Sequence, residues 1–363
     1  MLTDSRSGAA RVWQVLLSLL LCGDLAGCGV AYLAQATQGQ WRLMRARRPI
    51  DQVLRDPASP AQLKSRLELV LDAREFASSA LALPDNRSYR SYSDLGRPYA
   101  VWNVVAAPEF SITPLHWCFP FTGCLSYRGY FHEQRARAFA DELAARGNDT
   151  LVAGVPAYST LGHFADPVLN TMMRYGDLEM VSMIFHELAH QLIYFKGATQ
   201  FNESFAVTME QEGLRRWLAA RGRSAELAQF QARRNADRQF IQVLANGRAA
   251  LDALYHQPLS AEDMRTRKRA LLAGIGDDVR ALEQQLHWRS GYDGWIDAGL
   301  NNAHLASIAT YSDCVPGFQQ LLARNGGDLP AFYAAVRRLK RDRDGRQALC
   351  RQPAEPATAV PTP

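Results

Sequence analysis

The residues of this chain best suited to chemistry lie in one pentapeptide, His186-Glu187-Leu188-Ala189-His190. It is an instance of the pattern HExxH. In a helix, residues four positions apart lie one above the other on the same face, so both imidazoles would point toward a common site. Two imidazoles held in this way suit a divalent cation, most often Zn²⁺. Glu187 could then face a metal-bound water without being a ligand itself.

The sequence around this motif predicts a buried helix. Its apolar neighbours are Met183, Ile184, Phe185, Leu188 and Ala189. Such a flank would place the site inside a core, in a shaped cavity with little water. The alternative is a buried helix whose two histidines are satisfied by hydrogen bonds and bind no metal.

A third ligand is expected, because catalytic zinc sites usually have three protein ligands and a water. Gly197 predicts the end of the first helix, and Asn202 is predicted to cap the start of a second helix that runs to about Leu218. A short turn between antiparallel helices would bring Glu203, in the first turn of the second helix, back toward His190. The sequence therefore predicts a site of the His-His-Glu type.

Two alternatives apply to the carboxylates of this second helix. Glu203 could be an ordinary first-turn carboxylate favoured by the helix dipole. Glu210, two turns further along the same face, is the second candidate ligand, or else a hydrogen-bond partner of a histidine ring.

Two further segments are candidates for contacts to a substrate. Tyr311 lies in a weakly charged stretch, 295–318, and is a candidate oxyanion stabiliser, the alternative being a core tyrosine. The polar segment Tyr158–Pro167 follows a predicted strand that could hold an extended peptide by strand addition. Its alternative is a structural loop with a buried aspartate. His163, within this segment, is expected to be structural.

The N-terminus predicts export and lipidation. The apolar run 12–21 is too short to span a membrane and fits a signal peptide. It is followed by Leu25-Ala26-Gly27-Cys28, which looks like a bacterial lipoprotein cleavage site. We expect residues 1–27 to be removed and Cys28 to carry an acyl anchor in membrane lipid. The protein would then face the periplasm in the bacterial cell envelope, with Gly29 favouring the outer membrane. An ordinary signal peptide and an uncleaved buried helix are the alternatives.

Export would leave four cysteines for disulfide bonds. Cys118 and Cys124 bracket the short turn CFPFTGC, and a disulfide is expected there in an oxidising compartment. Cys314 and Cys350 could also pair, but their spacing does not decide it.

Composition indicates an ordinary globular protein. The hydrophobic fraction is 47% and the net charge of +5 is spread along the chain, with no nucleic-acid-binding motif. We expect one domain over residues 28–350 and a disordered Pro-, Ala- and Thr-rich tail over 351–363.

Periodicity predicts an α+β fold, mostly helical, with a small mixed sheet before the metal-binding helix. Helices are expected at 29–44, 60–81 and 130–146, strands at 99–107 and 149–158, and a hairpin at 116–130. After the motif, long helices are expected at about 224–247 and 261–288.

Several blocks of the chain together resemble the bacterial putative aminopeptidase family, zinc-dependent lipoproteins with the gluzincin arrangement of HExxH plus Glu. The blocks are Asn103–Pro108, Cys118-Phe119-Pro120 with Gly123-Cys124, Tyr127–Phe131, Ala157–Gly162, Ile184–Gln191 and Phe201–Ala206. The resemblance implies a zincin-like fold, metal ligands at His186, His190 and Glu203, and a catalytic Glu187. His163 departs from the family pattern, in which an aromatic residue stands there.

The predicted function is zinc-dependent hydrolysis of peptide bonds by a membrane-anchored aminopeptidase. No acidic residue that captures the free α-amine of a substrate is recognisable, so an endopeptidase acting on envelope proteins stays open. A non-catalytic envelope lipoprotein with structural zinc, and a scaffold without metal, stay open as well. Structural zinc would usually have four protein ligands and no need of Glu187.

Overall fold

The structure is a computed structural model that describes residues 32, 35–119, 123–157, 160–308 and 314–352. It contains two compact units, Met1–Ala46 and Arg47–Pro363. In the first unit, residues 35–45 are helical, within the region where a helix was expected. The predicted signal peptide, Cys28 and most of the predicted tail lie outside the described residues.

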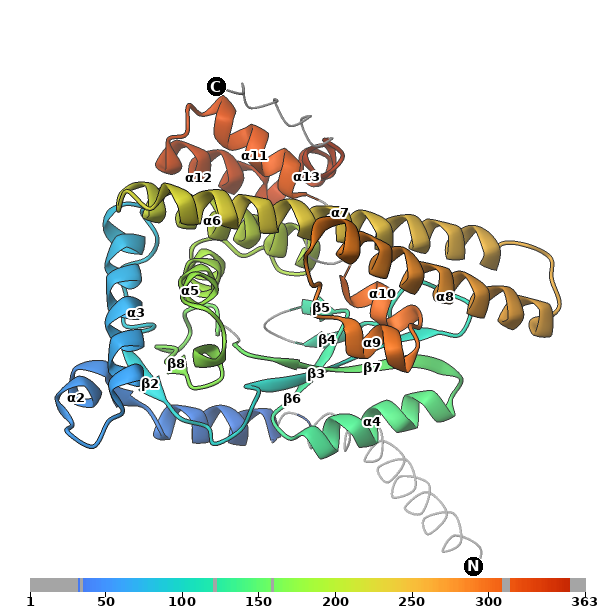
Figure 1. Ribbon diagram of the computed structural model, residues 1–363, viewed down its shortest axis with the longest axis horizontal. Helices are drawn as coiled ribbons and strands as arrows, with labels where there is room; N and C mark the ends of the chain where they lie inside the picture. Colours follow the sequence, from blue (N-terminus) through green and yellow to red (C-terminus); the bar gives the residue numbers. More distant parts are fainter. Residues whose placement is uncertain (1–31, 33–34, 120–122, 158–159, 309–313, 353–363) are drawn as a thin grey trace, which may run out of the picture. The chain divides into compact units, whose positions relative to one another are not determined.

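The second unit is α+β, as expected, and all remaining elements belong to it (Figure 1). Its first half contains β1 (Arg48–Pro49), α2 (Ile50–Arg55), α3 (Ala61–Ser79), β2 (Ser91–Ser93), β3 (Val101–Pro108), β4 (Trp117–Phe119), β5 (Gly123–Leu125), β6 (Arg128–Tyr130), α4 (Glu133–Ala145), β7 (Asn148–Val155) and β8 (Val168–Leu169). Its second half is helical: α5 (Asp177–Leu192), α6 (Thr199–Ala219), α7 (Ser224–Tyr255), α8 (Ala261–Leu286), α9 (Asp293–Ala298), α10 (Asn302–Ile308), α11 (Val315–Arg324), α12 (Leu329–Arg338) and α13 (Arg343–Cys350).

The described strands form three small sheets instead of the single mixed sheet that was expected. β3 is the centre of an antiparallel sheet, with β6 on one side and β7 on the other. β2 pairs antiparallel with β1 and parallel with β8, and β4 and β5 form a hairpin. The expected hairpin at 116–130 is therefore shorter, because β6 pairs with β3 and places Tyr130 opposite Trp102.

Helices cover the central strand and account for its continuous apolar sequence. Both α4 and α10 contact β3 and β7. Val104, Ala106 and Ala107 of β3 are fully buried, although neighbouring side chains in a strand point to opposite faces. The sheet therefore contributes to the core on both sides.

The helix α5 lies between α3 and α6 and is packed closely against both. Phe185 of α5 is fully buried. A Cβ atom at Gly213 of α6 would lie 2.8 Å from Cδ2 of Phe185 and 2.9 Å from Cδ1 of Leu81. Glycine at this position thus permits α6 to approach α5 closely.

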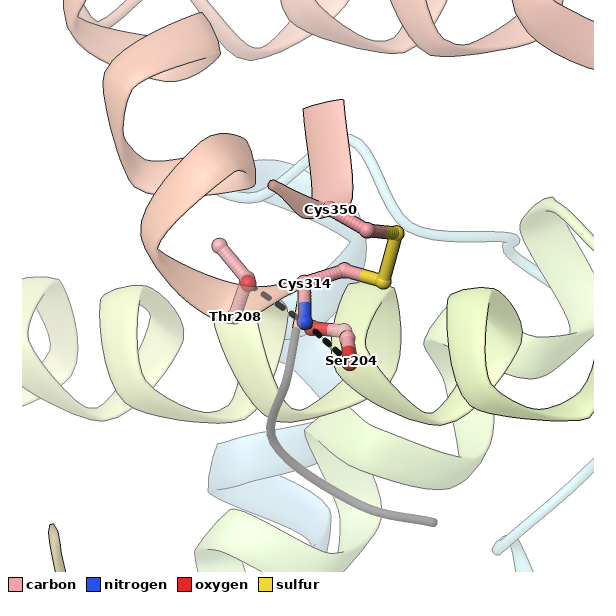
Figure 2. The surroundings of a disulfide bond; sticks show 4 residues. All are labelled: Ser204, Thr208, Cys314 and Cys350. Carbon is pink, nitrogen blue, oxygen red and sulfur yellow. Dashed lines mark hydrogen bonds between the residues drawn. A yellow bond between two sulfur atoms is a disulfide. The ribbon is translucent and has the colours of Figure 1, made fainter. Parts of the chain in front are cut away.

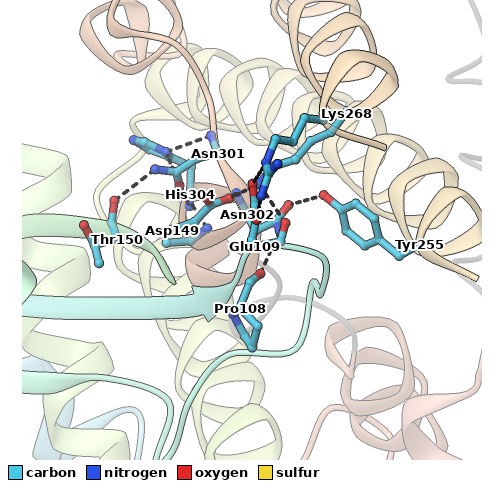
Figure 3. A network of polar contacts seen from close by, with 11 residues as sticks. Pro108, Glu109, Asp149, Thr150, Tyr255, Lys268, Asn301, Asn302 and His304 are labelled. Atoms are coloured by element: carbon cyan, nitrogen blue, oxygen red, sulfur yellow. Dashed lines mark hydrogen bonds and ion pairs between the residues drawn. The ribbon is translucent and has the colours of Figure 1, made fainter. Parts of the chain in front are cut away.

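A buried polar network fixes α10 to the sheet (Figure 3). Nζ of Lys268, on α8, donates to Oδ2 of Asp149 at 2.6 Å and to the carbonyl oxygen of Glu109 at 2.8 Å. The backbone N–H of Asn302 donates to the same Asp149 oxygen, and the hydroxyl of Tyr255 donates to the Asn302 side chain. Lys268 and Asn302 are buried, so these bonds satisfy groups that would otherwise be costly to remove from water.

A disulfide between Cys314 and Cys350 joins the start of α11 to the end of α13 (Figure 2). The backbone N–H of Cys314 also donates to Oγ of Ser204 on α6, at 3.2 Å. The C-terminal helices are therefore fastened to one another covalently and to α6 by a hydrogen bond. Within the described part of the chain, no helix combines the length and apolar character needed to cross a membrane.

Candidate metal centre

The site is built on two consecutive, closely packed helices, α5 and α6. α5 ends at Leu192 because Ile193 adopts an extended backbone conformation, and Gly197 has a positive φ of 74° in the connection that follows. Asn202 does not cap α6, contrary to the prediction, because the helix begins earlier, at Thr199. Its side chain instead accepts a hydrogen bond from the Phe195 N–H and donates one to the Phe195 carbonyl. Asn202 therefore fixes the connection that sets α6 against α5.

Three side chains converge where the sequence predicted ligands. Oε2 of Glu203 lies 3.5 Å from Nε2 of His186 and 3.5 Å from Nε2 of His190. One ligating atom from each residue lies within 4.8 Å of the other two. The two imidazole rings are nearly perpendicular, with centroids 4.8 Å apart. Two imidazole nitrogens and one carboxylate oxygen, aimed at one point, are a donor set that suits Zn²⁺.

The outer nitrogen of the first histidine also has a partner. Nδ1 of His186 lies 3.2 Å from Oε2 of Glu210. The other oxygen of that carboxylate accepts a hydrogen bond from Arg234 of α7. Glu210, the second candidate ligand, is thus placed behind His186, where it would orient the ring and fix its tautomer.

The outer nitrogen of the second histidine, His190, does not have such a partner among the described residues. Nδ1 of His190 is buried and has no hydrogen-bond partner among the described residues. A buried ring nitrogen without a hydrogen-bond partner costs free energy. The alternative of two structural histidines that are both satisfied by hydrogen bonds therefore does not describe His190 among the described residues.

The electrostatics of the site favour the charged form of Glu203. Burial raises the pKa of Glu203, but the adjacent His190 and His186 imidazoles outweigh burial and bring the pKa well below its usual range. Burial lowers the pKa of His186, but its contact to Glu203 and the charge of Glu187 raise it more. Glu203 is therefore a carboxylate at neutral pH, in the form that ligates a cation.

Glu187 lies beside the ligands without being tied to the fold. Its side chain is partly buried and makes no hydrogen bond or ion pair with another described residue. Burial raises the pKa of its carboxyl group, and the two neighbouring imidazoles oppose that shift. A carboxyl group with a raised pKa is a better proton acceptor near neutral pH than an exposed glutamate.

The segment before α5 is fastened to the motif helix. The Asp166 carboxylate accepts hydrogen bonds from the N–H and hydroxyl of Thr160. Gln191, which directly follows His190, donates to the same carboxylate at 3.4 Å and to Oγ of Ser88 at 3.2 Å. This arrangement agrees with a structural loop around a buried aspartate, and His163 within it is exposed.

Two residues near the site were not predicted from the sequence. Two residues that were predicted lie outside the described structure. Arg234 lies on the long helix predicted at about 224–247, and no spacing signal links it to Glu210. Gln191 was a polar residue at the end of a buried helix, which was an available signal. Tyr311 and Cys28 fall outside the described residues. Asn302, from the stretch around Tyr311, is committed to the buried network.

The predicted turn CFPFTGC contains a disulfide between Cys118 and Cys124. Gly123 of this turn faces the connection between α5 and α6, since a Cβ atom there would lie 3.0 Å from the backbone nitrogen of Gly197. The hairpin therefore abuts the segment that leads into α6.

Among the comparisons with known proteins, one finds a match to this chain. No curated protein and no solved structure matches the chain. A sequence model of the family described as "Putative aminopeptidase" matches residues 31–349, which include every described residue of the candidate site. The chain therefore belongs to the putative aminopeptidase family.

Proposed function

We propose that this protein is a zinc-dependent peptidase, an aminopeptidase with a zincin-like site. Family membership suggests peptidase activity. The observation that carries the zinc dependence is the convergence of His186, His190 and Glu203, beside a Glu187 that the fold does not use. Within the described residues the ligating group has three members, which fits a catalytic site better than structural zinc with four protein ligands.

The zinc ion and the protein's own side chains would supply different parts of the reaction. Zinc held by His186, His190 and Glu203 would supply a Lewis acid and lower the pKa of a water. Glu187 accepts a proton from that water at its carboxylate and then delivers it to the leaving amine. Glu210 holds the His186 ring in the tautomer whose Nε2 faces the ion. The buried setting keeps bulk water from competing for these groups.

The test separates metal binding from hydrolysis. Glu187→Gln should bind one zinc with an affinity close to that of the wild type, while kcat/KM for peptide hydrolysis falls by about 10²–10⁴-fold. Glu203→Gln should lose most of its zinc affinity. Glu212→Gln is the matched control, because Glu212 lies on the same helix and its ion pairs, among the described residues, are with Arg215 and Arg216. Full hydrolysis by Glu187→Gln, or wild-type protein without stoichiometric zinc, would contradict the proposal.

We also propose that acyl chains on Cys28 anchor the protein in a bacterial envelope membrane, facing the periplasm. The support is the sequence Leu25-Ala26-Gly27-Cys28 after a short apolar run. Expressed in a Gram-negative host, the wild type should fractionate with membranes and incorporate labelled palmitate. Cys28→Ser should do neither, whereas Cys22→Ser, within the predicted signal peptide, should behave as the wild type.

A further inference from the structure

A cavity of about 620 Å³ lies at the start of α6. The first turn of α6 forms one wall, through Thr199, Gln200 and Phe201. Thr199 and Gln200 precede Glu203 by four and three positions, so they lie on the same helix face, within roughly 6 Å along the axis. The cavity is therefore about one helical turn from a proposed metal ligand.

The described lining of this cavity is strongly basic. It includes Arg248 from α7 and Arg343 and Arg346 from α13, with His116 on the side of the hairpin. No aspartate or glutamate is among the lining residues in the described part of the chain. Three guanidinium groups without a lining carboxylate give the cavity a positive potential.

Two of these arginines have no carboxylate partner in the described part of the chain. No ion pair among the described residues includes Arg343 or Arg346. By contrast, Arg215, Arg216 and Arg223 each pair with a glutamate. The positive charge at the cavity is thus left available to a ligand.

The wall that carries these arginines is held in place. Nη1 of Arg346 donates to the carbonyl oxygens of Leu339 and Lys340, and its guanidinium carbon lies 5.9 Å from the centre of the Phe195 ring. Cys350, which ends the same helix, is covalently bonded to Cys314 beside α6 (Figure 2). The lining also includes Cys124, which belongs to the second disulfide. A preorganised basic cavity loses little entropy when it binds an anion.

We propose that this cavity binds a carboxylate group of the peptide substrate, either the C-terminal carboxylate of a short peptide or an acidic side chain. The proposal rests on the proposed peptidase function and adds the substrate class. Guanidinium groups form strong, paired hydrogen bonds with carboxylates, and a peptide held there would lie within a few residues of the metal. The enzyme would therefore prefer substrates with a negative charge near the scissile bond.

Equilibrium binding tests this without turnover. Zinc-loaded Glu187→Gln protein is titrated with two matched peptide pairs, trialanine as free acid or amide, and Ala-Glu-Ala-amide or Ala-Gln-Ala-amide. We expect the carboxylate member of one pair to bind at least about tenfold more tightly. The first pair identifies the C-terminal carboxylate as the ligand group, and the second identifies an acidic side chain.

Variants of the lining arginines test whether the cavity is responsible for the preference for carboxylate peptides. Adding Arg343→Gln, at an exposed position, should reduce the preference several-fold, and adding Arg346→Gln as well should bring it within about twofold of unity. Arg341→Gln, an exposed arginine outside the lining, is the matched control and should keep the full preference. Equal binding within both pairs by the parent, including no binding at all, overturns the proposal, as does a preference that survives both Arg343→Gln and Arg346→Gln.

Hydrolysis of the same peptides by the wild type is measured separately. Cleavage without carboxylate preference would contradict only the cavity proposal. Carboxylate-selective binding without cleavage would contradict only the peptidase proposal.

Discussion

Nδ1 of His186 lies 3.2 Å from Oε2 of Glu210, so this carboxylate lies behind the ring and outside the candidate metal centre. Glu210 is held in turn by Arg234 of α7. The first proposed ligand is therefore positioned by a chain of contacts that crosses three helices.

Loss of this contact should weaken zinc binding. Glu210→Gln keeps the size of the side chain but removes the charge that supports the His186 ring, and we expect a 10- to 100-fold loss in zinc affinity. Competition with a chromophoric chelator measures it. Glu212→Gln, which removes an ion pair two residues further along, should change the affinity by less than about twofold. A similar loss in both variants would show that general helix destabilisation, and not ring positioning, is responsible.

The close contact between α5 and α6 predicts a strong effect of one methyl group. Gly213→Ala would drive a Cβ atom against Phe185 and Leu81, and should lower the free energy of unfolding by about 1–3 kcal/mol. Because Phe185 adjoins His186, zinc affinity should fall as well. Gly274→Ala is the control, since nothing lies within 4 Å of its Cβ position in α8, and it should stabilise by up to about 1 kcal/mol. Chemical denaturation compares the two, and a stabilised Gly213→Ala would contradict the packing.

Because the His304 side chain is buried, we expect the protein to lose stability in acid. Burial lowers the pKa of His304 to about 4, below its unfolded value of 6.5, and its Nδ1 accepts a hydrogen bond from the Asn301 N–H. Between these two values the unfolded chain binds a proton that the folded protein does not. Stability present above pH 6.5 is therefore lost as the pH falls toward 4, by at most about 3 kcal/mol.

The measurement is the free energy of unfolding against pH for wild type and His304→Asn. The variant should show a shallower fall between pH 6.5 and 4, by about the same amount. His163→Asn, at an exposed histidine, should follow the wild-type curve. Parallel curves for wild type and His304→Asn would refute the assignment.

The two disulfides should contribute unequally to stability. Cys314 and Cys350 are 36 residues apart, and Cys118 and Cys124 are 6 apart. On the loop-entropy scale, replacing the first pair by alanine should cost about 4 kcal/mol and replacing the second about 2 kcal/mol. Urea denaturation of the two double variants measures the difference. A larger loss for the short hairpin would mean that its contact with the α5–α6 connection matters more than loop length.

The helical pair that bears the site was predictable because its signals are local. The HExxH spacing, the glycine in the connection after α5 and the carboxylate soon after it all lie within one short stretch. Long helices such as α7 and α8 were likewise predictable from their strongly helical, charged sequences, although α7 extends to Tyr255 and not to about residue 247.

Features that depend on distant pairing were not predictable. β6 adjoins the β4–β5 hairpin in sequence, yet its hydrogen bonds go to β3, and short strands do not specify their partners. Asn202 was assigned to capping because that is its commonest use at a helix start, whereas the connection to Phe195 recruits it. The link from Arg234 to Glu210 and the clustering of arginines from α7 and α13 likewise depend on tertiary packing.

All three proposed ligands lie on the consecutive helices α5 and α6, in the stretch from His186 to Glu203. Closing so short a loop costs little chain entropy, and contacts near in sequence form early. The three proposed ligand positions can therefore come together before the C-terminal helices have been synthesised. The arginine-bearing side of the cavity would be added later, when Cys350 forms its disulfide with Cys314.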